Sequence, residues 1–293
     1  MILSVSLNPK IEKIGRVKRF QVGKMNKIEI TRESSGGRGI NAARFIKKIG
    51  GEVLITGIIG GKTGEYIEEE LKREGIDTDF YVTEEESRIS IKIFDEKGLR
   101  TDVSEVGPLL SPIDTKGFVD KFKEIVKDFD VVLLSGSIPS GVPENIYFRL
   151  ITIAKDAGKI TILDAEGEPL IEGIKGSPTI ARVDKPDFDK ICGSSLVSPA
   201  RRIKTVKGPK PEIIIVNFEK GSVLFNFEEK VYHLLSPEKF NGNDRDGFRD
   251  RFIGAISYFL DSGSDYIDSI KKALSISLQE GINFERKLVL REV

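Results

Sequence analysis

The sequence predicts an α/β fold, in which a doubly wound parallel sheet lies between two layers of helices (α/β/α) and carries a small β-sheet lid. Three observations support this prediction. Short apolar runs of strand length recur along the chain, stretches with helical apolar spacing lie between them, and two charged segments have alternating apolar residues. Nearly continuous apolar strands are typical of a parallel sheet covered on both faces. Alternation of such strands with helices is typical of doubly wound folds.

The core strands and helices follow from these patterns. The apolar runs predict strands at residues 3–7, 53–59, 131–135, 159–163 and 212–218. Apolar residues at helical spacing predict helices around residues 40–49, 66–71, 118–126, 147–154 and 248–260.

The lid is predicted from two excursions, at about residues 10–32 and 87–105. The first is charged and strand-like, and the second alternates apolar Ile89, Ile91 and Ile93 with polar residues. Alternation with a period of two indicates strands with one exposed face, which would form a separate small sheet. Because no repeat or low-complexity linker interrupts the chain, we expect residues 1–293 to form one domain from which the lid projects.

Composition excludes several classes of function. Lys plus Arg and Asp plus Glu both number 46, so the net charge of zero gives no reason to expect nucleic acid or an anionic membrane as a partner. One cysteine, no apolar run long enough to span a bilayer and no signal-peptide pattern predict a cytoplasmic protein. With one histidine, a transition-metal site or a hydrolase triad is not expected. Carboxylates, amides and backbone dipoles remain, and these are the groups that phosphoryl transfer uses.

A polar turn at residues 241–246 leads into the helix predicted near residue 248, with Asp246 at the junction. Aspartate is favoured at such a position as a helix cap, because its carboxylate accepts hydrogen bonds from free backbone N–H groups. The same carboxylate could act as a catalytic base beside an anion-binding helix terminus. Both interpretations stay open from these residues alone.

A second candidate site is the glycine-rich stretch that contains Gly36, Gly37, Arg38, Gly39 and Asn41. Glycines let backbone N–H groups approach a ligand closely, although a flexible helix start has the same composition. Its spacing also resembles a dinucleotide-binding fingerprint, but no core strand precedes it, as that fingerprint requires. A Gly-Gly-Lys-Thr sequence at residues 60–63 lacks the first glycine of a P-loop at the required spacing.

Taken together, these stretches resemble the PfkB (ribokinase-like) family of carbohydrate kinases, most closely the 1-phosphofructokinase and tagatose-6-phosphate kinase branch. The resemblance covers essentially the whole chain in the expected order. It is carried by the motifs at residues 6–12 (SLNPKIE), 36–41 (GGRGIN), 60–64 (GGKTG), 86–89 (ESRI), 135–143 (SGSIPSGVP) and 164–168 (DAEGE), and by Asp246.

The resemblance implies a ribokinase-like fold, ATP and Mg²⁺ as cofactors, a phosphorylated ketohexose as substrate and a homodimer formed through the lid. Asp246 would take the proton from the attacking hydroxyl group. By the same resemblance, the substrate-binding residues would be Glu12, Gly36, Gly37, Arg38, Gly39, Asn41, Arg88 and Ser137, with Arg38 and Arg88 facing the phosphate. The nucleotide-binding residues would be Asp184, Asn217, Glu219, Gly221 and Asn243, and Asp184 and Asp187 would support the metal through water.

The nucleotide-side motifs depart from the family pattern. Asn243, Asp244 and Arg245 replace the first three residues of the Gly-Ala-Gly-Asp signature, which removes both glycines and adds a negative charge near an incoming triphosphate. Arg245 could offset that charge and is included with Asp246 as a catalytic candidate.

The leading hypothesis is an ATP-dependent kinase that converts fructose 1-phosphate to fructose 1,6-bisphosphate, or acts on tagatose 6-phosphate. The alternative is a catalytically impaired, sugar-phosphate-binding or regulatory protein. An NAD-dependent oxidoreductase would require binding of a nicotinamide cofactor.

Overall fold

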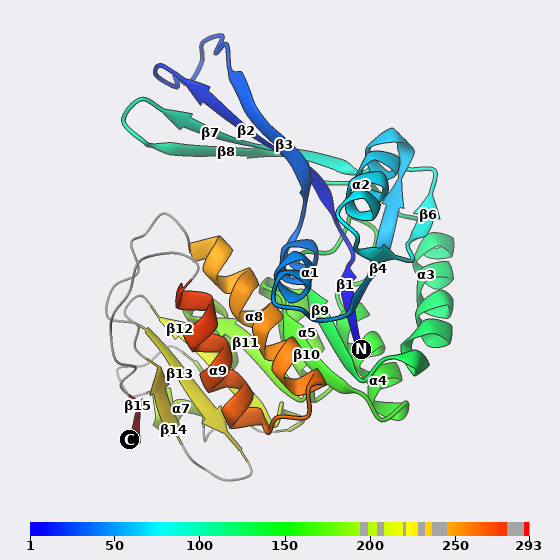
Figure 1. Cartoon of the computed structure of the whole chain (residues 1–293), viewed down its shortest axis with the longest axis vertical. Coiled ribbons are helices and arrows are strands. Elements are labelled where there is room, and N and C mark those ends of the chain that lie inside the picture. The colour runs from blue at the N-terminus through cyan, green and yellow to red at the C-terminus, as the bar shows by residue number, and fades with distance from the viewer. Residues whose placement is uncertain are drawn as a thin grey trace.

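A computed structural model describes residues 1–193, 199–203, 208–218, 221–227, 232–235, 245–279 and 290–292. Within these residues the chain has the predicted three layers, with a large central sheet between two sets of helices and a four-stranded sheet projecting from one end (Figure 1). The α/β/α prediction and the small β-sheet lid are therefore confirmed.

The large sheet is mostly parallel. Its described strands run in the order β15-β14-β13-β12-β11-β10-β9-β1-β4-β5, and β6 pairs with β4. Strands β12 to β15 pair with each other antiparallel, whereas the pairs from β12 to β5 are parallel. The bounds are β1 (Ile2–Ser6), β4 (Val53–Gly60), β5 (Asp77–Thr78), β6 (Tyr81–Thr83), β9 (Val131–Ser135), β10 (Ile160–Asp164), β11 (Ile180–Asp184), β12 (Ile213–Phe218), β13 (Gly221–Asn226), β14 (Tyr232–Leu235) and β15 (Leu290–Glu292).

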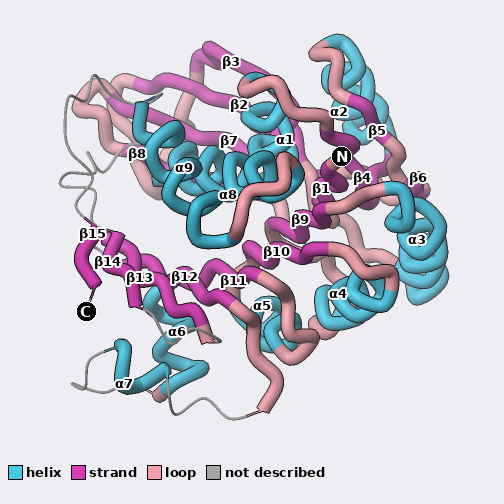
Figure 2. Tube along the Cα trace, turned by 60° about the horizontal axis from the view of Figure 1, so that its bottom comes forward, coloured by secondary structure: helices cyan, strands magenta, loops and turns pink. Residues whose placement is uncertain are grey.

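Successive residues of the central strands enter opposite halves of the core, as the period of a strand requires. Ile2 and Leu133 pack on the face that α1, α2, α8 and α9 cover, whereas Leu3 and Leu134 pack on the face that α3 to α7 cover (Figure 2). The helices are α1 (Arg38–Lys48), α2 (Gly61–Arg73), α3 (Pro112–Ile125), α4 (Ile146–Asp156), α5 (Gly167–Ile174), α6 (Lys185–Cys192), α7 (Pro199–Ile203), α8 (Arg245–Asp261) and α9 (Tyr266–Gln279), with a short 3₁₀ turn η1 (Val126–Asp128).

Strand β11 is absent from the sequence prediction. Its centre holds Arg182, which is only 1% exposed and interrupts the apolar run that would have marked a core strand. The arginine is accommodated because it forms ion pairs with Asp164 and Asp184. A buried charge with partners of opposite sign is the usual exception to an apolar interior.

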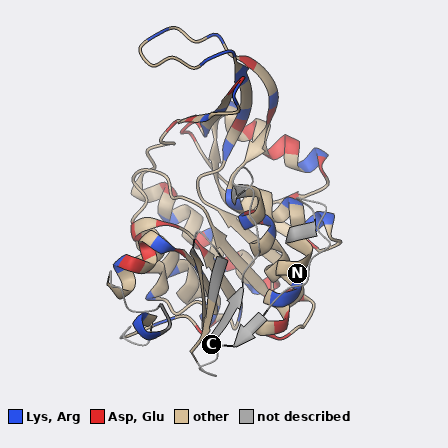
Figure 3. Cartoon of the chain, turned by 90° about the vertical axis from the view of Figure 1, so that its left-hand side faces the viewer, with Lys and Arg blue, Asp and Glu red and all other residues tan. Residues whose placement is uncertain are grey.

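The lid sheet has the order β3-β2-β7-β8, formed by β2 (Lys10–Val17), β3 (Glu29–Gly36), β7 (Arg88–Asp95) and β8 (Arg100–Ser104). Strand β3 continues past the expected lid boundary at residue 32 as far as Gly36, so the lid leads almost directly into α1. Acidic and basic residues are interspersed along the lid and the core (Figure 3). Among the described residues, no helix is long and apolar enough to cross a membrane.

Candidate active site

A cavity of about 280 Å³ is lined by residues that follow the carboxyl ends of β1 and β9, by the start of α1, by α8 and by the lid. This is the edge of a doubly wound sheet at which ligands generally bind. Six of the predicted substrate-binding residues line the cavity: Glu12, Gly37, Arg38, Asn41, Arg88 and Ser137. Gly36 and Gly39 lie beside it rather than in its lining.

Gly37 and Gly39 fix how α1 begins at this cavity. Gly37 has a φ of 131°, a conformation that side chains rarely adopt, and it immediately precedes the helix. A Cβ atom on Gly39 would lie 3.1 Å from the backbone oxygen of Val5 at the end of β1. The glycines therefore allow the start of α1 to pack closely against β1, which presents Arg38 and Asn41 to the cavity.

The lid contributes one face of three strands to the cavity. All of its lining residues have even numbers, which places them on one side of the pleat: Lys10 and Glu12 from β2, Arg88, Ser90 and Lys92 from β7, and Arg100, Asp102 and Ser104 from β8. Lys92, Arg100 and Asp102 were missed by the sequence prediction. The alternation of Ile89, Ile91 and Ile93 contained the signal, because the residues between those isoleucines face the opposite side.

Arg88 is held with its charge available to a ligand. Its Nε and Nη2 donate to the backbone oxygen of Asn8 at 3.2 Å, Nη1 donates to Ser104 Oγ at 3.2 Å, and Nη2 donates to Ser137 Oγ at 3.3 Å. Burial, and secondarily the positive charge of Arg38, lower the pKa of Arg88. Within the described part of the chain, Arg88 has no carboxylate in ion-pair distance. A guanidinium group in this state is suited to a phosphate group.

Glu12 is positioned by two lysines. Its carboxylate forms ion pairs with Lys10 Nζ at 2.8 Å and with Lys92 Nζ at 2.9 Å. Burial by itself raises the pKa of Glu12, but the two ammonium groups outweigh this effect and leave the pKa below its usual value. Glu12 is therefore an ionised hydrogen-bond acceptor at the lid side of the cavity.

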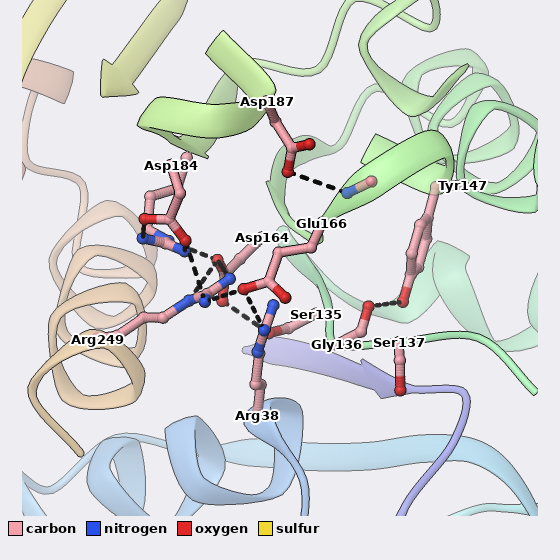
Figure 4. A network of polar contacts seen from close by, with 12 residues as sticks. Arg38, Ser135, Gly136, Ser137, Tyr147, Asp164, Glu166, Asp184, Asp187 and Arg249 are labelled. Carbon is pink, nitrogen blue, oxygen red and sulfur yellow. Dashed lines mark hydrogen bonds and ion pairs between the residues drawn. The ribbon is translucent and has the colours of Figure 1, made fainter. Parts of the chain in front are cut away.

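An ion-pair network lies next to the cavity, at the carboxyl ends of β10 and β11 (Figure 4). Asp164 Oδ1 accepts from Arg182 Nε at 2.6 Å and from Arg249 Nη2 at 2.9 Å. Burial alone raises the pKa of Asp164, but the arginines, Arg249 first, outweigh it and hold that pKa far below its usual range. The pKa of Arg249 is raised: burial lowers it, but the carboxylates, Asp164 first, outweigh that effect.

The network extends on both sides of Arg249. Glu166 pairs with Arg249 and with Arg38, and so connects the network to the start of α1. Asp184 accepts hydrogen bonds from Arg182 Nη1 and Nη2, both at 3.0 Å, and lies 3.4 Å from Arg249 Nη1. Arg249 was not predicted as a site residue. Its signal in the sequence is limited to a basic residue within the helix predicted near residue 248.

The two carboxylates predicted to support a metal are both engaged. Asp184 is paired with the arginines, and Asp187 accepts from the Gly167 N–H at 3.0 Å and from Lys190 at 3.1 Å. In the described residues, no group of three or more acidic, histidine or cysteine side chains is arranged to hold a metal ion. The arrangement therefore does not fit direct binding of a divalent cation, and support through water stays a prediction.

The other nucleotide-side predictions are only partly within the described residues. Asn217 lies in β12, in register with Asp184 of β11, at the same edge of the sheet. Gly221 is the first residue of β13. Glu219 and Asn243 lie outside the described residues, as do the side chains of Arg245 and Asp246. The backbone places Asp246 as the second residue of α8.

Asp250 is a further cavity residue that sequence reasoning did not select. It lies in α8, is 5% exposed, and accepts a hydrogen bond from Asn41 Nδ2 at 2.7 Å through Oδ2. Burial raises its pKa to about 7. The Asn41 hydrogen bond and the charges of Arg249 and Arg38 oppose this rise, whereas the negative charge of Asp164 adds to it.

Comparison with known proteins gives one family and one fold. Residues 5–278 match the family described as pfkB family carbohydrate kinase. A structure described as a possible 1-phosphofructokinase from Thermotoga maritima is 24% identical, with a TM-score of 0.86, and the match covers 100% of this chain and 99% of that one. The phosphofructokinase-2 of Escherichia coli in complex with fructose-6-phosphate is 19% identical, with a TM-score of 0.79 and coverage of 94% and 92%. At these identities the structural likeness establishes the ribokinase-like fold.

Proposed function

Because the chain belongs to the pfkB family of carbohydrate kinases, we propose that it transfers a phosphoryl group from ATP to a phosphorylated ketohexose. Fructose 1-phosphate is the first candidate acceptor and tagatose 6-phosphate the second. The observation that carries this proposal is Arg88, a half-buried guanidinium group without a carboxylate partner among the described residues, in a cavity that also presents hydroxyl-binding groups.

The cavity composition supports a phosphorylated rather than a neutral sugar. Of the described residues, six basic ones (Lys10, Arg38, Arg88, Lys92, Arg100 and Arg249) and three acidic ones (Glu12, Asp102 and Asp250) line it. We assign the existing phosphate of the substrate to Arg88 and Arg38. Glu12, Asn41 and Ser137 offer the hydrogen-bonding groups that sugar hydroxyls require, and Gly36, Gly37 and Gly39 shape the approach of α1 to the ligand.

The chemistry is assigned to the start of α8. Asp246 would accept the proton of the attacking hydroxyl group, and Arg245 would stabilise negative charge on the transferring phosphoryl group. Asp184, Asn217, Glu219, Gly221 and Asn243 are proposed to border the nucleotide. Mg²⁺ would accompany ATP as the counter-ion of its phosphates, and Asp184 and Asp187, which are both paired, would support it only through water.

The test is ADP release with fructose 1-phosphate, fructose 6-phosphate and tagatose 6-phosphate as acceptors. We expect turnover with at least one of them, loss of turnover without loss of sugar-phosphate binding in Asp246→Asn, and binding weakened by about tenfold or more in Arg88→Ala. Arg32→Ala, an exposed arginine of the lid outside the cavity lining, serves as the control. Absence of turnover with every acceptor would contradict the kinase proposal.

A second candidate function is a sugar-phosphate-binding protein with impaired catalysis. The observation that favours it is the pairing of Arg249 with Asp164 and Glu166, because this network fills the side of the site nearest the predicted nucleotide residues with internal ion pairs. Calorimetry separates the two functions. The binding protein would take up a sugar phosphate and show little or no binding of ATP, whereas the kinase would bind both.

A further inference from the structure

Asp250 is the cavity carboxylate whose hydrogen bonding is least complete. Oδ2 accepts from Asn41 Nδ2 at 2.7 Å, whereas Oδ1 is buried and has no hydrogen-bond partner among the residues that the structure describes. The side chain is 5% exposed and lines the cavity. A buried acceptor without a donor is unfavourable, so the native site is one in which a ligand can supply the missing hydrogen.

The two other acidic residues of the cavity are already neutralised. Glu12 pairs with Lys10 and Lys92, and Asp102 pairs with Arg100. The partner of Asp250 is the neutral amide group of Asn41, where Glu12 and Asp102 have cationic partners. The arginine next to it in α8, Arg249, directs its guanidinium group toward Asp164, Glu166 and Asp184 (Figure 4).

A second buried acceptor lies at the Arg88 side of the same cavity. Asn8 is 5% exposed, and its Nδ2 donates to the backbone oxygen of Ile138 at 3.3 Å, while its Oδ1 has no hydrogen-bond partner in the described part of the chain. The lining thus combines a guanidinium group that suits a phosphate with separated acceptors that suit hydroxyl groups. A phosphorylated polyol has both kinds of group in one molecule.

We propose that Asp250 is a specificity-determining residue that accepts a hydrogen bond from a hydroxyl group of the bound sugar phosphate, with Asn41 holding the carboxylate in place. This inference rests on the proposed function, because it takes a sugar phosphate as the ligand and Arg88 as its phosphate contact. It adds a contact in α8 to those that the sequence motifs imply.

The position of Asp250 in α8 relates this contact to the reaction. Asp250 follows Asp246 by four residues, and residues four apart lie on the same side of a helix, one turn from each other. The hydroxyl group bound by Asp250 is therefore expected to be a neighbour of the hydroxyl group that reacts. Loss of this contact should reduce both the affinity for the sugar phosphate and the discrimination between its stereoisomers.

The experiment is calorimetric titration of Asp250→Asn, Asp250→Ala and the wild-type protein with the three ketohexose phosphates and with inorganic phosphate. We expect Asp250→Ala to bind the preferred sugar phosphate about 10- to 100-fold more weakly, the range for a hydrogen bond to a charged group. Affinity for inorganic phosphate should change by less than about twofold, because that probe needs only the proposed phosphate contacts, Arg88 and Arg38. Asp156→Asn, an exposed aspartate at the end of α4, is the matched control.

The pH dependence separates ligand contact from a structural role. Since the pKa of Asp250 is about 7, the wild-type carboxyl group is ionised at pH 8 and neutral at pH 5.5. The affinity ratio of wild type to Asp250→Asn should therefore be large at pH 8 and approach one at pH 5.5. The ligand phosphate titrates in the same range but cancels in this ratio, because both proteins bind the same ligand.

The outcomes are distinguishable from those of the proposed function. If Arg88→Ala loses sugar-phosphate affinity while both Asp250 variants retain it at pH 8, the role of Asp250 is overturned and the proposed site stands. If the wild-type protein binds inorganic phosphate but no sugar phosphate, the proposed function and this inference both fall. Circular dichroism of each variant establishes that the compared proteins are folded.

Discussion

At the scale of single residues, Asp250 stands out because its environment makes ionisation unfavourable. A carboxyl group with a raised pKa in the folded state holds its proton where the unfolded chain has released it. Stability then falls as the pH rises from about 4, the ordinary aspartate value, to about 7, the folded pKa. Above pH 7 the full cost of the buried charge is present.

Replacement by an uncharged group of the same shape should remove this cost. We expect Asp250→Asn to be more stable than the wild type by about 1–3 kcal/mol at pH 8 and close to it at pH 4. Urea unfolding at both pH values measures the difference. A variant that is destabilised at pH 8 would indicate that the ionised carboxylate stabilises the fold. Higher stability with weaker ligand binding would indicate a residue kept for function.

Single residues also show which parts of the cavity lining could be predicted from the sequence. Glu12, Arg38, Asn41 and Arg88 were predicted because they lie in continuous motifs, and each lines the cavity. Asp250 could not be assigned in this way, because its significance depends on burial and on contact with Asn41, 209 positions away in the sequence. Its sequence signal was limited to a charged residue within the helix that follows Asp246.

At the scale of elements, Arg249 joins α8 to the carboxyl ends of β10 and β11. Removal of its guanidinium group leaves Asp164, which is 1% exposed at its side chain, with Arg182 as its remaining ion-pair partner among the described residues. Breaking a buried ion pair by removing one partner costs about 3–5 kcal/mol, and the retained Arg182 should keep the effect near or below the lower end. We expect Arg249→Ala to lose about 2–3 kcal/mol of unfolding free energy at pH 7.

The pH dependence of this loss has a defined sign. The pKa of Asp164 is depressed in the folded state, so the stabilisation is complete above the ordinary aspartate pKa and is lost as the pH falls toward the folded value. The stability difference between wild type and Arg249→Ala should shrink below about pH 4, and above about pH 6 it should grow as Asp250 ionises, because Arg249 lowers the pKa of Asp250. Arg149→Ala, on the exposed side of α4, is the control. An equal difference at pH 3 and pH 7 would contradict an electrostatic role.

Elements were predictable where their pattern was local. The lid strands were predicted from charge and alternation, and β1, β4, β9, β10 and β12 from apolar runs. Strand β11 was not predicted, because its buried Arg182 interrupts the apolar run and is stabilised by partners from β10 and from its own end. The pairing of Asp184 with Arg182 was hidden for the same reason. A sequence motif can identify a charged residue as a candidate for the site. The partner with which that residue forms an ion pair is determined only when the strands assemble into the sheet.

At the scale of the whole molecule, the three layers follow from the order of strands and helices along the chain. The site could be predicted less completely, because it forms where β1, β9, α1, α8 and the lid meet. The residues that one of these elements contributes are far in sequence from those that the others contribute. The sequence motifs contain the residues of α1, of the lid and after β9 that were predicted and that line the cavity. The ion-pair network beside it depends on side-chain packing between α8 and the sheet, which no local pattern encodes.

The lid also bears on assembly. Its cavity face is polar, whereas Val103 of β8, on the opposite side of the pleat, is 49% exposed, and Ile30 of β3 is 45% exposed. Strands β3 and β8 are the two edges of the lid sheet, and exposed edges with apolar side chains favour pairing with another chain. We propose that two copies of the chain associate through this surface.

Light scattering after size-exclusion chromatography tests this assembly. We expect the wild-type protein to be a dimer and Val103→Glu to shift it toward monomer, because a carboxylate would then be buried in an apolar contact without a partner. Val82→Glu is the matched control, since Val82 of β6 is 68% exposed but belongs to the large sheet. A wild-type monomer at every concentration, or a dimer that Val103→Glu leaves intact, would place the contact elsewhere or exclude it. A monomer produced by Val103→Glu that still binds sugar phosphate with wild-type affinity would show that each lid completes its own cavity.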